Sequence, residues 1–111
     1  MNNLRNKVQL IGRLGMDPEV KVLDSGKKLA KFSIATTEAY KNQKGERVED
    51  TQWHNIIVWE RNAEFAEKFL SKGKEIALEG KLSNRTYEDS NGVKRYTTEI
   101  IANDFVLFGK K

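Results

Sequence analysis

Two tryptophans on one strand-like segment are the residues whose type and spacing most clearly suit a binding site. Alternation along residues 51–60 places Trp53 and Trp59 on one side of the segment and Ile56 and Val58 on the other. The side with small branched residues suits a core, so we expect both tryptophans to face outward, about 20 Å apart at about 3.3 Å per residue. Tryptophans exposed in this way need a functional or packing reason.

Further aromatic rings and cations accompany the tryptophans along the chain. Tyr40 ends the preceding strand pattern, and Tyr87 lies near the tip of a later hairpin. The basic residues that neighbour these rings in the sequence are Lys41, Lys44, Arg47, Arg61 and Arg85. Bases of a single strand stack on ring faces at about 1–3 kcal/mol each, while cations follow the phosphates. The combination favours a surface that binds single-stranded nucleic acid without reading its sequence.

Three other interpretations fit part of this pattern. The rings could be core residues or an oligomer contact, which is how most tryptophans in small domains are used. A barrel that meets only protein partners would use them as interface anchors. A metal-dependent nuclease would need fixed carboxylates, and Glu46, Glu49 and Asp50 lie instead in a charged segment that we interpret as a solvated loop.

The remaining candidates for chemistry are weak. His54, the sole histidine, lies beside branched aliphatic residues, and the sequence places no serine or carboxylate as its partner, so we assign it to packing. The glycines Gly12 and Gly15 lack the spacing and the following helix of a phosphate-binding loop. We therefore expect no catalytic residue, no metal site and no cofactor, and we predict that the chain is not an enzyme.

Composition limits the class of protein further. A chain of 111 residues fits one domain, here predicted to span 1–111. Lys and Arg number 20 against 16 Asp and Glu, and this excess of +4 suits a polyanionic partner without requiring one. The sequence has no cysteine and no apolar stretch long enough for a signal peptide or a membrane span. We expect a cytoplasmic protein with no membrane partner.

Strand patterns make up most of the chain. Apolar and polar residues alternate in five longer stretches, 6–14, 30–40, 51–60, 75–87 and 94–108, and briefly at 20–22. Glycines at positions 12 and 15 stand where a sheet would bend sharply. Asn91 and Gly92 are a strong hairpin signal between the last two stretches.

Two segments depart from the strand pattern. Residues 41–50 carry six charges and one valine, so we expect a mobile, solvated hairpin loop. Residues 61–70 have a period near 3.6, which predicts the single helix, with Asn62 as its N-cap, Glu64 in its first turn and an end near Lys72-Gly73.

These elements predict an all-β fold of about five strands, three before the helix and two after it. A sandwich of this length would rarely place its one helix between the third and fourth strands. A five-stranded Greek-key barrel of the oligonucleotide-binding (OB) kind does so, and it presents one face and its loops to oligonucleotides. The expected architecture is therefore a single OB-fold barrel with the helix between strands 3 and 4.

A series of short motifs in fixed order resembles one family over nearly the whole chain. The motifs are Asn6-Lys7-Val8, Ile11-Gly12-Arg13-Leu14-Gly15, Asp17-Pro18-Glu19, Ala35-Thr36-Thr37-Glu38, Thr51-Gln52-Trp53-His54, Lys72-Gly73, Glu79-Gly80 and Arg95-Tyr96-Thr97-Thr98-Glu99. In this order they resemble the bacterial single-stranded DNA-binding protein family. The resemblance implies sequence-independent binding and protection of single-stranded DNA during DNA replication, recombination and repair, in a nucleoid-associated protein.

The resemblance also implies particular site residues. The stacking rings would be Tyr40, Trp53, Trp59 and Tyr87, the same four that alternation and charge indicate. The cations that follow the DNA backbone would be Lys7, Arg61, Lys72 and Arg85. Asn55 and Ser83 stand where a relative has arginine, so contacts there should be weaker or absent. His54 matches a histidine linked to subunit association.

The resemblance implies a homotetramer with DNA wrapped around it. A dimeric, primosome-type replication protein is the nearest alternative, and a stable dimer would favour it. Family members usually continue into a flexible tail with an acidic tip that recruits other proteins. This chain stops at Lys111 without such a tail, so we expect no partner recruitment through one.

Overall fold

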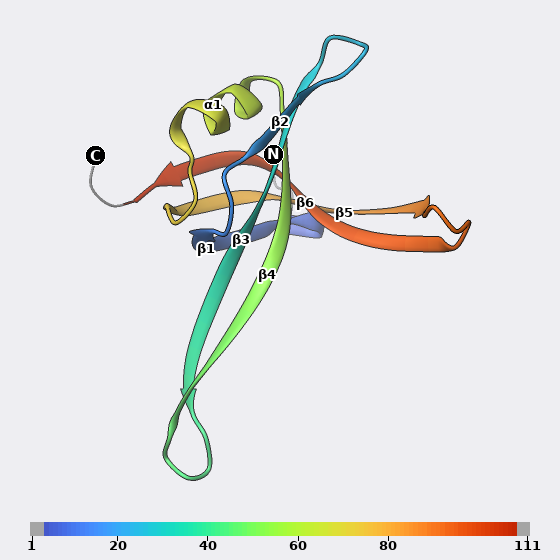
Figure 1. Ribbon diagram of the computed structural model, residues 1–111. Helices are drawn as coiled ribbons and strands as arrows, with labels where there is room; N and C mark the ends of the chain where they lie inside the picture. The colour runs from blue at the N-terminus through green and yellow to red at the C-terminus, as the bar shows by residue number, and fades with distance from the viewer. Residues whose placement is uncertain (1–3, 109–111) are drawn as a thin grey trace.

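Strands form most of the computed structural model, which describes residues 4–108 (Figure 1). The strands within this range are β1 (Val8–Leu14), β2 (Glu19–Val22), β3 (Lys28–Lys41), β4 (Arg47–Trp59), β5 (Glu75–Glu88) and β6 (Lys94–Leu107). The helices of the same residues are the short 3-10 helix η1 (Leu4–Asn6) and α1 (Arg61–Phe69). The predicted strands and helix are all present.

A closed barrel organises these strands. Their hydrogen-bonded order is β1-β5-β6-β4-β3-β2, and β1 also pairs with β3 at Arg13–Ala35 and Leu14–Ile34, which closes the ring. Neighbouring strands are antiparallel except β4 and β6, which run parallel at Ile56–Ile100 and Ile57–Ile101. The expected five-stranded barrel, with its helix between the third and fourth barrel strands, is confirmed. The short β2 lies outside the ring and pairs with β3.

Alternate residues of the barrel strands fill the core, as the period of a strand requires. The fully buried side chains of largest volume are Ile34, Val58, Ile56 and Ile76. Helix α1 adds its buried alanines to the same cluster and packs against β2, β3 and β4. The Phe65 ring of α1 stacks on the Phe105 ring of β6, with centroids 5.7 Å apart.

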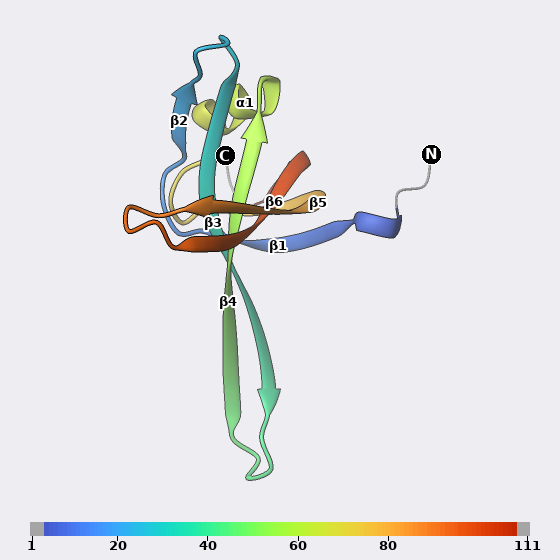
Figure 2. The ribbon, with the colours of Figure 1, turned by 90° about the vertical axis from the view of Figure 1, so that its right-hand side faces the viewer.

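Two long hairpins leave the barrel in different directions. The β3–β4 ribbon continues past the barrel as a twisted arm, and the β5–β6 hairpin extends to another side (Figures 1 and 2). Gly92, at φ 75°, lies in the β5–β6 turn, as the Asn91-Gly92 signal predicts. Each hairpin carries aromatic and charged side chains beyond the core.

The hairpin predicted at 41–50 is present, but its loop is shorter than expected. Strand β3 runs to Lys41 and β4 begins at Arg47, so that these two residues pair and the turn covers 42–46. Asn42 Oδ1 closes the turn by accepting hydrogen bonds from the backbone N–H of Lys44, at 2.9 Å, and of Glu46, at 3.0 Å. Charged residues are tolerated in this ribbon because both of its faces meet solvent.

The predicted N-cap is also wrong, although the helix is placed within one residue. The chain passes directly from β4 into α1, and Glu60 occupies the cap position with φ 56° and no capping side-chain bond. Glu60 is held there by β3: its N–H donates to the Lys28 carbonyl at 2.7 Å, and its carboxylate accepts from the Lys28 N–H at 3.1 Å. Asn62 lies inside the helix.

Within residues 4–108, no helix combines the length and apolar character needed to cross a membrane. The expectation that the chain ends without an acidic tail concerns residues 109–111, which lie outside the described residues.

Closure of the barrel depends on Gly12. A Cβ placed on this residue would lie 2.3 Å from the backbone oxygen of Ala35 on β3. Because that oxygen belongs to the backbone, a change of side-chain rotamer cannot remove the clash. We expect Gly12→Ala to destabilise the protein by about 1–3 kcal/mol, because the added methyl group must push β1 and β3 apart. Urea unfolding at fixed chain concentration measures this, and Gln52→Ala, on an exposed strand position, should stay within about 0.5 kcal/mol of the parent. Equal stability of the two variants would contradict the tight contact.

Candidate nucleic-acid interface

Strand pairing assembles one outward surface from several strands, which we call the aromatic face. It consists of side chains on the outer side of β4, β5 and β6, namely Trp53, Asn55, Ile57, Trp59, Ser83, Arg85, Tyr87 and Glu99. Ile57 on β4 lies beside Ile101 on β6, which in turn pairs with Lys81 on β5. Counting along the strands in steps of two from this row places the listed residues on the same side.

Trp53 is the most exposed ring of this face, with 63% of its surface accessible. Its indole lies against Gly15: a Cβ on Gly15 would come within 2.4 Å of Trp53 Cζ3 and within 3.1 Å of Ser33 Oγ. The glycine therefore makes room for the ring beside the backbone. The predicted outward orientation of Trp53 is confirmed, and the core interpretation fails for it.

Trp59 lies on the same side at the end of β4, where it is 36% exposed. It pairs with Leu29 of β3, which is buried and pairs with Lys21 of β2. Arg61 follows two residues later, at the start of α1. The ring is thus exposed in part, and a cation lies close to it in the chain.

The two tyrosines lie on the hairpins. Tyr87 is exposed near the end of β5, and its alternation matches that of Ser83 and Arg85. Tyr40 is exposed on the β3–β4 arm opposite Val48, but its alternation matches that of Ile34 and not that of the aromatic face. The arm twists beyond the barrel (Figure 1), so alternation alone does not set the direction of its tip.

The predicted cations differ in their partners. Lys7 Nζ lies 3.5 Å from the Glu79 carboxylate. Among residues 4–108, Arg61 and Lys72 take part in no ion pair. Lys72 lies in the loop after α1, where its backbone N–H donates to Asp17 Oδ1 at 2.8 Å. Its ammonium group is therefore available to an anion.

Arg85 is bound to a buried carboxylate. Its Nε donates to Glu99 Oε1 and its Nη2 to Glu99 Oε2, each at 3.0 Å. Glu99 is 7% exposed and is the one buried charged residue of the described chain, whereas the Arg85 side chain is 52% exposed. These hydrogen bonds and the charge of Glu99 raise the pKa of Arg85 above its ordinary value. Residues 83–85 of β5 pair with 97–99 of β6, so the bond runs diagonally across the hairpin.

Comparison with known proteins agrees with this geometry. The profile of the single-strand binding protein family matches residues 5–108. The chain belongs to this family.

Relatives of known name support the assignment. A single-stranded DNA-binding protein of Neisseria meningitidis is 43% identical over 104 residues, covering 94% of this chain and 60% of the relative. One from Xylella fastidiosa is 42% identical over 107 residues, covering 96% and 79%. The chain thus spans about 60% of the Neisseria relative's length.

Solved structures of the family have the same fold. A structure of Plasmodium falciparum SSB in complex with ssDNA superposes with a TM-score of 0.86 at 34% identity, covering 98% of this chain and all of that one. A deletion mutant of the single-stranded DNA binding protein from Thermus aquaticus gives a TM-score of 0.81 at 26% identity, covering 94% of this chain and 50% of that one.

Sequence reasoning missed two residues of the candidate interface, Arg13 and Glu99. Arg13 shares a row with Ala35 and Trp53, because β1 pairs with β3 there. Glu99 and Asn55 line one groove of about 250 Å³ on the aromatic face. The position of Glu99 could have been predicted, because pairing the residues outward from the hairpin turn at 91–92 brings it close to Arg85. The position of Arg13 could not, because it depends on the closure of the barrel by β1 and β3.

His54 lies half-buried on the inner side of β4, and its Nε2 is 2.9 Å from Thr36 Oγ1. This agrees with the assignment to packing. In the part of the chain that the structure describes, no group of three or more histidine, aspartate, glutamate or cysteine residues is arranged to hold a metal ion. Glu49 and Asp50, expected in a loop, lie on β4.

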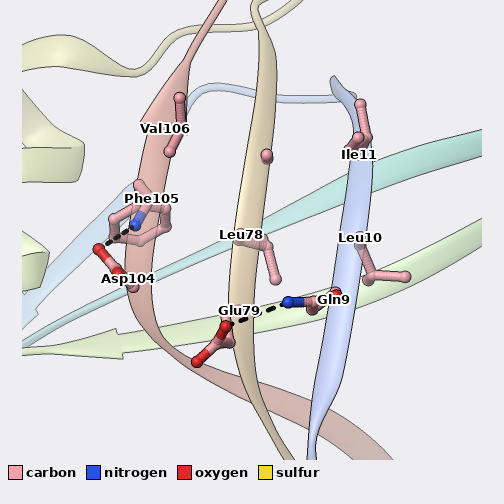
Figure 3. A pocket seen from close by; sticks show the side chains of 9 residues that line it. Gln9, Leu10, Ile11, Leu78, Glu79, Asp104, Phe105 and Val106 are labelled. Carbon is pink, nitrogen blue, oxygen red and sulfur yellow. Dashed lines mark hydrogen bonds between the residues drawn. The ribbon is translucent and has the colours of Figure 1, made fainter.

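A second groove of about 540 Å³ lies over β1, β5 and β6, away from the aromatic face (Figure 3). Apolar side chains of Leu10, Ile11, Leu78, Phe105 and Val106 line it, and a hydrogen bond of 3.2 Å from Gln9 to Glu79 crosses one end. Ile11 and Val106 are exposed there.

The turn that carries Tyr87 depends on the Asp89 carboxylate. Asp89 Oδ1 accepts from the N–H of Asn91 and Val93 at 2.9 and 3.0 Å, and Oδ2 accepts from Arg95 Nε at 2.9 Å. The bond from Val93, followed by that from Arg95, lowers the pKa of Asp89 below its ordinary value.

Because the pKa of Asp89 is lower in the folded protein than in the unfolded chain, its carboxylate contributes to the stability of the fold. This contribution to stability is complete above the unfolded pKa of about 3.9 and is lost as the pH falls through the folded pKa. We expect the amide resonances of Asn91 and Val93 to shift with a midpoint below the ordinary aspartate value, in an NMR titration. In Asp89→Asn the same resonances should show no carboxyl titration. A midpoint above the ordinary aspartate value would contradict the interpretation.

Proposed function

We propose that this chain binds single-stranded DNA without sequence preference, by stacking bases on Trp53, Trp59, Tyr87 and Tyr40 and by contacts of Lys7, Arg61, Lys72 and Arg85 with the DNA backbone. The observation that carries the proposal is the exposure of Trp53 and Trp59 on one side of a barrel strand. Membership of the family, and likeness to a structure solved with ssDNA, support DNA as the ligand.

Stacking explains why such binding would ignore sequence. Every base has a flat π-face, and a ring can stack on any of them, whereas hydrogen bonds to base edges discriminate. Trp53 and Trp59 are separated by about 20 Å along β4, which lets a single strand contact both while its phosphates meet Arg61 and Lys72. The proposed activity is binding and involves no covalent step.

The proposed role is to coat and protect single strands during DNA replication, recombination and repair. Binding without sequence preference suits this role, because the exposed strand differs from one site to the next. The protein would then act in the cytoplasm on the nucleoid, where its ligand forms.

We also propose that the chain assembles with copies of itself, as a homotetramer. The apolar groove over β1, β5 and β6 supports this, since exposed apolar side chains gather there on a small domain. Within the described residues, Val8 to Ile11 of β1 pair with β5 on one edge and with no strand on the other, which leaves an edge that another strand could join. His54 is assigned to subunit association on the resemblance, and its bond to Thr36 is compatible with that role.

The stacking proposal predicts the effect of removing rings. Trp53→Ala and Tyr87→Ala should each weaken binding of oligo-dT by about 5- to 150-fold, the equivalent of about 1–3 kcal/mol per stacked base. Tyr96→Ala is the matched control, because Tyr96 is 77% exposed on the same hairpin but alternates to the opposite side from Tyr87. Fluorescence titration at two salt concentrations measures all three.

Loss of affinity in Tyr96→Ala equal to that in Tyr87→Ala would contradict the assignment of the aromatic face. If the parent protein shows no tryptophan quenching by oligo-dT at low salt, stacking on Trp53 and Trp59 is refuted. Loss of assembly without loss of DNA binding in Trp53→Ala would support a protein interface instead.

The assembly proposal predicts that a charge in the groove breaks the oligomer. Val106→Lys should lower the mass measured by light scattering at micromolar concentration, because a lysine cannot be buried there unpaired. Val93→Lys, at an exposed valine of the β5–β6 turn, should leave the parent mass unchanged. A monomeric or stably dimeric parent protein would contradict the tetramer.

A further inference from the structure

Arg85 and Glu99 form an unusual pair for a surface that meets a polyanion. A carboxylate at the centre of such a surface would repel phosphates, and Glu99 lies in the groove that Asn55 also lines. Both oxygens of Glu99 accept bonds from Arg85, so its charge is compensated at 3.0 Å. The pair as a whole carries no net charge.

The bidentate bond also fixes the guanidinium group. Nε and Nη2 are engaged by Glu99, which sets the plane of the group, and Nη1 makes no side-chain bond within the described residues. A planar guanidinium can stack on a base and donate hydrogen bonds in a way that a lysine ammonium cannot. Because about half of the Arg85 side chain is exposed, a ligand can reach it.

We propose that Arg85 serves as a fixed, charge-compensated plane against which a base stacks, and that Glu99 is the positioning residue that holds it. This proposal rests on the proposed function and revises one part of it, since Arg85 was expected to follow the phosphates as Arg61 and Lys72 do. A cation that already has a buried counter-charge displaces few counterions when DNA binds.

Salt dependence separates the two roles. On single strands, each phosphate neutralised contributes about 0.7 to the slope of log affinity against log salt concentration. Arg61→Ala and Lys72→Ala should each lower the magnitude of this slope by about 0.7. The double variant Arg85→Ala/Glu99→Gln, in which this site stays uncharged, should weaken oligo-dT binding by about 5-fold or more and leave the slope unchanged.

Two further variants test the plane and its support. Arg85→Lys keeps the charge but lacks the plane, so it should bind as weakly as the double variant. Glu99→Gln removes the counter-charge, so the slope should become steeper by about 0.7, and Arg85→Ala in the Glu99→Gln background should cancel that increase. Far-UV circular dichroism checks that each variant is folded, and the result for Arg85→Lys decides the matter if the variants with Glu99→Gln do not fold.

A fall of about 0.7 in the slope for the double variant, or parental affinity in Arg85→Lys, would overturn the proposal. Unchanged affinity in the double variant would do the same. Absence of oligo-dT binding by the parent protein would instead refute the proposed function, so the two failures are distinguishable.

Discussion

The pairing of β1 with β3 at Arg13–Ala35 and Leu14–Ile34 holds the rest of the structure in place. It joins β1, at one end of the hydrogen-bonded series, to β3, the fifth strand of that series, and turns an open sheet into a ring. The contact requires the β1 backbone at Gly12 to approach the Ala35 carbonyl more closely than any side chain allows. Without closure, the core residues of β3 and β4 would face solvent on one side, and the edges of β1 and β3 would be unpaired.

The strand order arranges the outside of the barrel. β4 lies between β3 and β6, so residues from separate hairpins come to lie on one surface. Asn55 on β4 and Glu99 on β6 are far apart in the sequence and line the same groove. The aromatic face is therefore a product of topology, while the core supplies the rigidity that keeps its rings in place.

Local periodicity was sufficient to predict much of this. Alternation through residues 51–60 predicted that Trp53 and Trp59 face outward, and the period of 3.6 in residues 61–70 predicted α1. The cap of α1 could not be predicted, because the N–H and the carboxylate of Glu60 are hydrogen-bonded to the backbone of Lys28, which is distant in the sequence. The extension of β4 to Arg47 was missed because a ribbon exposed on both faces has no apolar alternation to reveal it.

The contact of Trp53 with Gly15 ties two positions together for any change in the sequence. The space that the indole occupies is the space that a side chain at position 15 would need. A larger residue can be accepted at position 15 where the ring at position 53 is smaller or turned away, and a full indole at 53 demands glycine at 15. The two positions should therefore vary together among related chains, and a redesign of the ring must treat them as a unit.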